Sequence, residues 1–436
     1  MNNGSEKYKF VQKQEKEIRP IADDQQALED IAHEIPVPAE RIQALIEQYE
    51  TKIFISTYAG AHPHAGRLLL EAAQPANYKI LHPLIESLKS DVQCAGVTLL
   101  TDNVAGKMFL ADKDPAFQAA PSNDRPVIAD IPKGPYRAAL ILPEGGENVP
   151  TSVLLYGAKS VFGAEKLCFL SLGLFDPGEK KLFSQPVPEH REDIDIIFSA
   201  DAFSKQLFCG ALDVPEEKVI VTGTPLLEGL RVEEEDTLRA QGRAALGIAE
   251  DTMTALYSGF PSADFRSFGG DPHLNLLTFE QTLTGVVAAA VAEPAKKFSL
   301  IVRIHPRARN VEPPLISTQQ LPRNLTVVDG NGITYEEAVY ATDIICCCAS
   351  STESLLAAYR GREAAVFAFP GKGQLGELLT ENYGEKGEAI MRASDRMVVV
   401  DSPQKMSEML LHHTPREALP VKPGSLERMK EIMLSP

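Results

Sequence analysis

The feature that most constrains this chain is a regular alternation of short apolar runs with helical patterns, which occurs in two successive series. Runs of about four to eight apolar residues bounded by turn residues are typical of buried strands. The first series has such runs at residues 52–56, 92–100, 138–142, 166–170, 194–199 and 219–222, and the second at residues 254–257, 300–304, 325–328, 344–348, 365–369 and 397–400. Strands that alternate with helices pair in parallel, so the sequence predicts two α/β domains, each a mainly parallel sheet with helices on both faces.

Helical patterns, with apolar residues about three or four positions apart, fill the spaces between these runs. They are predicted at residues 65–73, 80–89, 149–161, 202–211, 276–292, 335–341, 352–359, 375–382 and 425–433. After Gly223 an acidic stretch begins at Glu233 and the alternation restarts beyond it, which indicates a domain boundary. We therefore expect a mobile tail and helical extension at residues 1–50, one domain at residues 51–225, and a second at residues 226–436 that ends in a terminal helix.

Composition and charge exclude several classes of protein. The 436 residues are 44% hydrophobic and 24% charged, which is typical of a chain that folds around sizeable cores. The formal net charge of −17 repels nucleic acid and anionic lipid, so we expect no nucleic-acid partner and at most peripheral contact with a membrane. The six cysteines lack the spacing of a disulfide framework or a zinc site, and Cys346, Cys347 and Cys348 are expected to be apolar strand residues. A cytoplasmic protein is the simplest expectation.

A hydroxyl-rich turn follows one strand of the second series. The apolar run at residues 344–348 leads through Ser350, Ser351, Thr352 and Glu353 into a helical pattern. The free N–H groups of a helix N-terminus bind phosphate, and hydroxyl side chains add donors there. The alternative is an ordinary N-cap in which one of the serines satisfies a backbone N–H.

A second polar element favours the phosphate interpretation. His305 and Arg307 follow the run at residues 300–304, so they leave the same predicted sheet at the same carboxyl edge, where ligands of such sheets bind. Histidine can donate to a phosphate and arginine can clamp an oxyanion with two bonds. Taken alone, a solvated surface turn explains this pair, but the two elements in this order favour a nucleotide phosphate.

The order of these motifs resembles the GT-B glycosyltransferases over roughly residues 194–369, nearest to the surface-polysaccharide, CDP-glycerol phosphotransferase and bacterial sialyltransferase-like branches. The motifs that carry the resemblance are Val219 to Pro225, His305-Pro306-Arg307, Tyr335-Glu336-Glu337-Ala338, Asp343, and Ser350-Ser351-Thr352-Glu353. The resemblance implies two Rossmann-like domains that face each other across a cleft, an N-terminal one for the acceptor and a C-terminal one for an activated donor. It also implies that His305 and residues 350–352 contact the nucleotide phosphates and that Glu353 contacts the ribose.

A transferase of this kind that inverts the sugar needs a general base to deprotonate the acceptor hydroxyl. Glu144, in Pro143-Glu144-Gly145-Gly146, partly matches the acidic-acidic-Gly element of bacterial sialyltransferases. His62 and His64, in the loop after the first predicted strand, are the other candidates. For each of the three, an ordinary solvated loop residue is the alternative.

The sequence also contains a dinucleotide-binding pattern, with Gly371, Gly373 and Gly376 between a strand and a helix. The pattern lies late in its domain, and Asp401 is further along than the usual ~20 residues, so a contribution of Gly371 and Gly373 to the donor pocket is favoured over NAD. Glu377 is then a candidate sugar contact.

Two Asp-x-Asp pairs have the spacing with which some glycosyltransferases hold a divalent metal. They are Asp112 with Asp114 and Asp193 with Asp195. Asp193 opens its predicted strand instead of closing it, and Asp112 follows a segment with a helical pattern. Both pairs are predicted to be solvated acids, and no metal is expected.

The sequence thus predicts a metal-independent glycosyltransferase that moves a sugar or polyol phosphate from a nucleotide-activated donor to a hydroxyl of a glycan or glycolipid. The nucleotide sugar is a co-substrate, and no other cofactor is expected. Surface-polysaccharide or glycoconjugate biosynthesis is the expected setting. The alternatives are a UDP-N-acetylhexosamine 2-epimerase of the same fold and a sugar-nucleotide-binding protein without catalysis, since a fold alone does not define a function.

Overall fold

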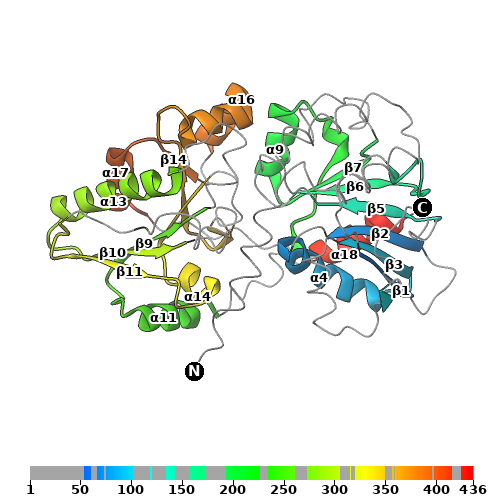
Figure 1. Cartoon of the computed structure of the whole chain (residues 1–436), viewed down its shortest axis with the longest axis horizontal. Coiled ribbons are helices and arrows are strands. Elements are labelled where there is room, and N and C mark those ends of the chain that lie inside the picture. The colour runs from blue at the N-terminus through cyan, green and yellow to red at the C-terminus, as the bar shows by residue number, and fades with distance from the viewer. Residues whose placement is uncertain are drawn as a thin grey trace, which may run out of the picture.

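A computed structural model describes the two sheet-forming parts of the chain, which lie towards opposite ends of its longest axis (Figure 1). The described residues are 54–59, 66–72, 75–101, 118–119, 134–142, 157–171, 193–225, 234–260, 273–304, 315, 320–348, 356–357, 359–394, 397–414 and 424–435. The predicted tail and helical extension at residues 1–50 lie outside these ranges.

The N-terminal part forms an eight-stranded sheet in the order β4-β1-β3-β2-β5-β6-β7-β8. Its strands are β1 (Phe54–Ala59), β2 (Gly66–Ala72), β3 (Cys94–Thr101), β4 (Gln118–Ala119), β5 (Ala138–Ile141), β6 (Leu167–Leu170), β7 (Ile196–Ser199) and β8 (Val219–Val221). The strands from β3 to β8 in this order pair in parallel, whereas β1 pairs antiparallel with both β3 and β4. Its helical elements are α4 (Pro75–Lys89), α9 (Ala202–Ala211) and the short η3 (Glu216–Lys218).

The C-terminal part forms a six-stranded sheet in the order β11-β10-β9-β12-β13-β14, and every pair is parallel. Its strands are β9 (Met253–Ser258), β10 (Phe298–Arg303), β11 (Leu325–Asp329), β12 (Ile344–Cys347), β13 (Glu363–Phe367) and β14 (Met397–Val400). Its helices are α11 (Glu235–Leu246), α13 (Leu274–Ala292), α14 (Tyr335–Tyr340), α16 (Leu375–Ala393) and α17 (Pro403–Leu411). This is the strand order of Rossmann domains, and two successive Rossmann-like sheets confirm the predicted GT-B fold.

One predicted helix is wrong, because residues 66–72 form the central strand β2. Leu68, Leu69 and Leu70 are completely buried between β3 and β5. A short apolar run without a clear period fits a buried strand and a buried helix equally well, so periodicity could not distinguish them. The consequence is that the first parallel strand of the domain is β2, and β1 is an additional antiparallel strand.

The terminal helix α18 (Ser425–Leu434) returns to the N-terminal sheet, although the sequence had grouped it with the second domain. Met429 and Met433 are fully buried in the core that β2 and α4 also build. Lys430 pairs with Asp91 at 3.2 Å, and Lys166 donates to the backbone oxygen of Ser435 at 2.7 Å. Figure 1 shows α18 beside α4, where both helices pack against the first sheet.

Two sets of contacts join the domains. The hydroxyl of Tyr359 donates to the backbone oxygen of Ala200 at the end of β7, at 3.2 Å, and α9 lies against α16 (Figure 1). Gly223, shortly after β8, lies close to Ser425 at the start of α18: a side chain at Gly223, where φ is +89°, would come within 2.9 Å of Ser425 Cβ. The end of β8 and the start of α18 therefore lie side by side.

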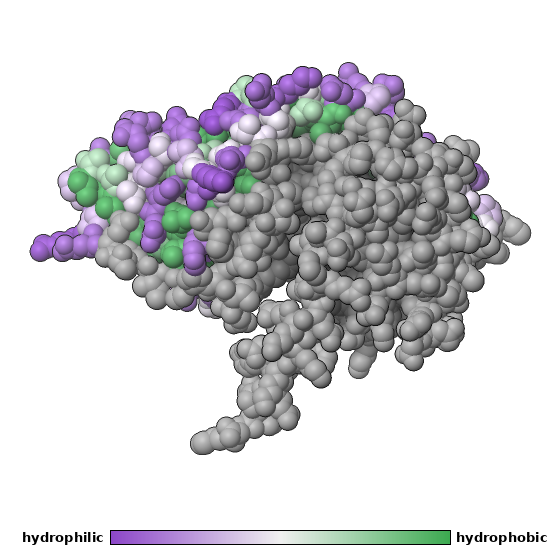
Figure 2. Space-filling view, turned by 45° about the horizontal axis from the view of Figure 1, so that its top comes forward, coloured by the Kyte–Doolittle hydropathy of each residue, from purple (hydrophilic) through white to green (hydrophobic). Residues whose placement is uncertain are grey.

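Helix α13 has the length and the apolar composition of a helix that could cross a membrane. However, 56% of its most apolar stretch is buried inside the protein. It packs on α17 and β10, with Phe279 and Leu283 in the core. Over the coloured part of the surface in Figure 2, hydrophilic residues surround smaller hydrophobic areas. We therefore describe α13 as a core helix.

A shortened side chain on the buried face of α18 tests the assignment of this helix to the N-terminal sheet. Met433→Ala should lower the free energy of unfolding by about 2–5 kcal/mol, because it leaves a cavity in a fully buried position. Glu431→Ala, at an exposed position of the same helix, is the matched control and should change it little. Hydrogen exchange should accelerate in β2 and α4 in the Met433 variant alone. Faster exchange confined to the second sheet would contradict the assignment.

Candidate functional site

The carboxyl edge of the C-terminal sheet has a switch point between β9 and β12. The chain passes from β9 through α13 to β10 on the face where Phe279 packs. From β12 it proceeds towards β13 on the opposite face, where Ala357 packs. In open parallel sheets, ligands bind outside the carboxyl ends of the strands at the point where the chain changes direction in this way. This edge is therefore the first candidate for a ligand site.

The strand register sets the geometry of this edge. Arg303 of β10 pairs with Ser258 of β9, and Cys346 of β12 pairs with Tyr257. Continuation of both registers brings Ile304 and Cys348 level with Gly259, on its two sides. Neighbouring strands lie about 4.8 Å apart, so the chain passes these two points roughly 10 Å from each other.

The predicted phosphate-binding residues follow directly after these two points. His305 and Arg307 come after Ile304, and Ser350, Ser351, Thr352 and Glu353 come after Cys348. All six lie outside the described residues, so their contacts stay a prediction. What the described strands show is that both segments start at one edge, on either side of one strand end.

The backbone before His305 is held by contacts that sequence reasoning missed. Asn331 Oδ1 accepts from the N–H of Ile304 at 3.0 Å, and the N–H of Asn331 donates in turn to Asp329 Oδ1 at 2.8 Å. The guanidinium of Arg303 donates to the backbone oxygens of Gly330 and Ile333 at 2.6 and 2.7 Å. The signal in the sequence is the Asp-Gly-Asn-Gly turn after β11, whose side chains are suited to such local bonds.

The glycine pattern after β13 builds a tight turn before α16. Gly371 and Gly373 have φ angles of +134° and +69°, in the region that L side chains rarely adopt. The N–H of Gln374 donates to the oxygen of Gly371 at 3.0 Å, and Glu377 accepts from the N–H of Gly373. The carboxylate predicted to contact a sugar thus holds its own loop, while the donor-binding role of this loop stays a prediction.

The NAD interpretation of this pattern gains no support. β13 is the fifth strand of its domain, whereas the dinucleotide pattern follows the first strand. Asp401 would be the ribose-binding acid of the NAD interpretation. Its Oδ2 lies 3.5 Å from the guanidinium of Arg392, with which it forms an ion pair.

The segments that carry the general-base candidates start at opposite edges of the N-terminal sheet. Glu144, His62 and His64 all lie outside the described residues. Because β1 is antiparallel, its last residue Ala59 pairs with Gly96 near the start of β3, at the amino edge. The loop with the two histidines therefore starts and ends at the amino edge. The segment with Glu144 starts at the carboxyl end of β5, which favours Glu144 as the base.

The other candidates from the sequence have structural roles where they are described. Cys346, Cys347 and Cys348 are buried in the reduced form, and burial raises the pKa of Cys346. Asp195 pairs with Lys159 at 2.7 Å and accepts from the N–H of Leu167 at 2.7 Å. Asp112 and Asp114 lie outside the described residues.

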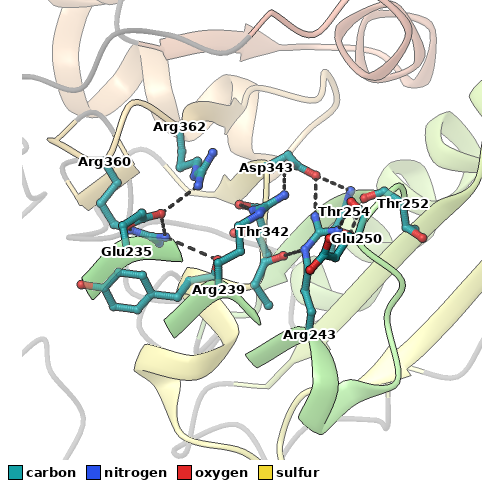
Figure 3. Close-up of polar contacts among 12 residues, drawn as sticks. Glu235, Arg239, Arg243, Glu250, Thr252, Thr254, Thr342, Asp343, Arg360 and Arg362 are labelled. Carbon is teal, nitrogen blue, oxygen red and sulfur yellow. Dashed lines mark hydrogen bonds and ion pairs between the residues drawn. The ribbon is translucent and has the colours of Figure 1, made fainter. Parts of the chain in front are cut away.

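Ion pairs hold the opposite, amino edge of the C-terminal sheet (Figure 3). Asp343, just before β12, pairs with Arg239 and Arg243 of α11 and accepts from the N–H of Thr254 in β9 at 2.9 Å. The carboxylate thereby ties the starts of β9 and β12 to one helix.

A second carboxylate at this edge acts in the same way. Glu235 at the start of α11 accepts from Arg360 at 2.5 and 2.9 Å and from Arg362 at 2.8 Å. The guanidinium of Arg360 also lies 3.8 Å from the centre of the Tyr340 ring. Burial by itself raises the pKa of Glu235, but the bonds and charges of the two arginines outweigh it and hold that pKa below its ordinary value. The start of β13 is thus tied to α11.

No family model and no curated protein matches the sequence. Among solved structures, the chain is similar to UDP-GlcNAc 2-epimerase from Neisseria meningitidis bound to UDP-GlcNAc, with 13% identity over 85% of this chain and 100% of that chain and a TM-score of 0.47. It is also similar to the UDP-GlcNAc 2-epimerase of Methanocaldococcus jannaschii in complex with UDP-GlcNAc and UDP, with 11% identity over 84% of this chain and 99% of that chain and a TM-score of 0.49. The similarity to a glycotransferase of kitacinnamycin has 13% identity over 85% of this chain and 95% of that chain and a TM-score of 0.47. Likenesses at this level give no information on activity, and the fold assignment depends on the strand order.

The pH dependence of stability tests the amino-edge ion pairs. A carboxylate whose pKa is depressed in the folded state stabilises the fold fully above its ordinary pKa and loses this contribution as the pH falls through the folded value. Glu235→Gln should therefore lower the free energy of unfolding by about 3–5 kcal/mol at pH 7, because it leaves the buried Arg360 unpaired. The difference from wild type should shrink as the pH falls below 4.5, the ordinary value for Glu235.

Denaturant unfolding followed from pH 7 to pH 3 measures this difference. The neighbouring exposed Asp236→Asn is the matched control and should cost less than about 1 kcal/mol at every pH. A difference between wild type and Glu235→Gln that is independent of pH would contradict the ion-pair explanation.

Proposed function

We propose that this chain is a glycosyltransferase of the GT-B fold that takes a sugar or polyol phosphate from a nucleotide-activated donor. The observation that supports the proposal is the register at the carboxyl edge of the C-terminal sheet. Ile304 and Cys348, which precede the two predicted phosphate-binding elements, flank Gly259 at the switch point. A diphosphate between two such elements would receive donors from both sides.

The chemistry of this donor site follows from the residue types. His305 and Arg307 supply ring and guanidinium N–H donors, and Ser350 to Thr352 supply hydroxyls and the free N–H groups of a helix start. Donors arranged in advance stabilise the charge that develops on the departing nucleotide. In this proposal no metal and no further cofactor take part, and the cytoplasmic nucleotide sugar is a co-substrate.

The acceptor is a hydroxyl of a glycan or glycolipid, bound on the N-terminal side. Glu144 is the proposed base, because its segment leaves β5 at the carboxyl edge of the first sheet. It takes the proton from the acceptor oxygen as that oxygen attacks the anomeric carbon of a sugar donor, or the phosphorus of a polyol-phosphate donor, and the bond to the departing nucleotide breaks. Surface-polysaccharide or glycoconjugate synthesis is the proposed setting.

Epimerisation of a UDP-N-acetylhexosamine is the second candidate, and it needs the same nucleotide site but no acceptor. Incubation with UDP-N-acetylglucosamine in deuterated water separates the two reactions. A transferase should leave C2 unlabelled, whereas an epimerase should place solvent deuterium at C2 without any acceptor, as read by mass spectrometry of the recovered sugar. Label at C2 would replace the transferase proposal by the epimerase.

Loss of the two phosphate-binding elements tests the donor site. A thermal-shift screen against UDP, GDP, CDP, CMP and ADP first identifies the preferred nucleotide, since a ligand stabilises the state that it binds. His305→Ala combined with Ser351→Ala should then weaken the binding of that nucleotide at least 100-fold in calorimetry, since each hydrogen bond to a charged group contributes about 1.5–3 kcal/mol.

The control for this variant is His412→Ala combined with Thr414→Ala, two exposed positions after α17. This control should bind the nucleotide as the wild type does. Unchanged affinity in the His305 and Ser351 double variant would remove the basis for the site.

A further inference from the structure

The N-terminal sheet has its own switch point, between β2 and β5. The chain leaves β2 through α4, which packs on the face of the sheet where Leu70 points. After β5 it returns on the opposite face, where Phe162 packs in the same core as Leu69. By the rule used for the other sheet, a ligand of this domain binds at the carboxyl ends of β2 and β5.

A buried carboxylate lies at this point. Glu71, the second-last residue of β2, has no exposed surface. Acidic side chains are rarely buried completely, because removal of a charge from water costs several kcal/mol unless donors hold it. One of these donors is the N–H of Leu142, 2.9 Å from Glu71 Oε2.

The hydrogen bond between Glu71 and Leu142 takes the place of a backbone hydrogen bond between the two strands. The register between β2 and β5 ends with Leu70 opposite Leu140, so the N–H of Leu142 lies beyond the parallel ladder. A side chain of one strand therefore holds the backbone of its neighbour where the strands end. The bond thus holds Leu142, the residue that follows β5.

We infer that Glu71 is a positioning residue for the acceptor: by holding Leu142 it fixes the carboxyl end of β5, and the acceptor hydroxyl binds at the carboxyl ends of β2 and β5. The inference rests on the proposed function. Glu144 follows Leu142 by two residues, and a general base must lie about 2.6–3.2 Å from the proton that it removes. A displacement of ~1 Å at such a position can reduce turnover about 100-fold.

The location of this edge agrees with delivery of an acceptor to the donor domain. β7 is parallel to β2 and β5, and the residue after it, Ala200, receives the hydrogen bond from Tyr359 of the C-terminal domain. The carboxyl edge of the first sheet is thus the edge that contacts the domain proposed to hold the donor.

Three variants of the full chain separate positioning from catalysis and from general stability. Glu71→Leu removes the acceptor of the Leu142 bond at similar size, and Glu71→Gln keeps an oxygen that can accept it. The matched control is Asp195→Leu, which removes a carboxylate that accepts from the N–H of Leu167 at 2.7 Å on the amino edge of the same sheet. Glu71→Asp, whose oxygen is one methylene short of Leu142, replaces the Leu variant if that variant does not fold.

Three measurements are made on each variant: hydrogen exchange of peptides that include Leu142, the dissociation constant for UDP, and release of UDP from UDP-N-acetylglucosamine with water as acceptor over a range of pH. In Glu71→Leu we expect at least tenfold faster exchange at Leu142, at least tenfold lower kcat, and an unchanged UDP dissociation constant. In Glu71→Gln we expect all three within about threefold of wild type and the same pH midpoint of turnover. Asp195→Leu should leave UDP release unchanged.

Several outcomes would overturn the inference. Unchanged exchange at Leu142 in Glu71→Leu would show that the carboxylate does not hold this segment. Equal loss of turnover in Glu71→Gln, with a shifted pH midpoint, would show that the charge itself takes part in the reaction. Loss of UDP affinity along with turnover, or an equal loss in Asp195→Leu, would indicate a merely structural role.

Failure of the proposed function has a different signature. A wild-type protein that binds UDP but releases none from any sugar nucleotide would overturn the transferase proposal and, with it, the acceptor role of Glu71. The exchange measurement would still decide whether Glu71 holds Leu142, because it does not depend on turnover.

Discussion

The position of β9 between β10 and β12 is the constraint on which the rest of the C-terminal domain depends. Parallel strands end at the same edge, so whatever follows β10 and β12 must begin on the two sides of the β9 end. At the amino edge, Asp343 and Glu235 form ion pairs with four arginines. The carboxyl edge is held instead by Arg303, which donates to a backbone oxygen of the turn after β11, and by Asn331 of that turn, which accepts from the N–H of Ile304. Ion pairs thus align the strands at one end, while the segments with the predicted phosphate-binding residues start from the other.

The same logic applies to the N-terminal sheet, where the connection to the second domain adds a further constraint. The chain leaves β8 through Gly223 and begins α18 at Ser425, and these two residues lie close together. α18 then packs on β2 and α4, so the end of the chain completes the core of its first half. Among the described residues, the Tyr359 bond and the packing of α9 on α16 join the two domains. Buried apolar residues of both domains belong to one core cluster, so a change in their relative position must disturb these contacts.

The sequence predicted the elements whose patterns are local. Apolar runs located every strand of the second sheet, and the helical patterns located α9, α13 and α18 to within a few residues. It misassigned β2 because the three consecutive leucines have no period, and this single error made β1 appear to be the first parallel strand. Because β1 is antiparallel, the loop with the two histidines starts at the amino edge. Glu71, placed on a helix, was not considered as a site residue.

The site residues differ in how far a sequence can reveal them. His305 and the hydroxyl run after β12 are visible because their chemistry is unusual at the end of a strand. Asn331 and Glu71 act through backbone N–H groups of Ile304 and Leu142, which lie 27 and 71 positions away in the chain. Such pairings depend on the strand order, which local patterns do not contain.

The net charge of the chain restricts how the proposed donor site can bind a nucleotide. At a net charge of −17 the field of the whole molecule repels a nucleotide diphosphate, so affinity must come from donors within hydrogen-bond distance. Arg303, the described arginine at this edge, already donates to the oxygens of Gly330 and Ile333. In the proposed donor site, the charge of the ligand is then left to His305, Arg307 and the predicted phosphate-binding residues 350–352. A site of this kind binds through a few directional contacts, which is why the alignment of Ile304 and Cys348 with Gly259 matters more for the proposed activity than the overall electrostatics of the protein.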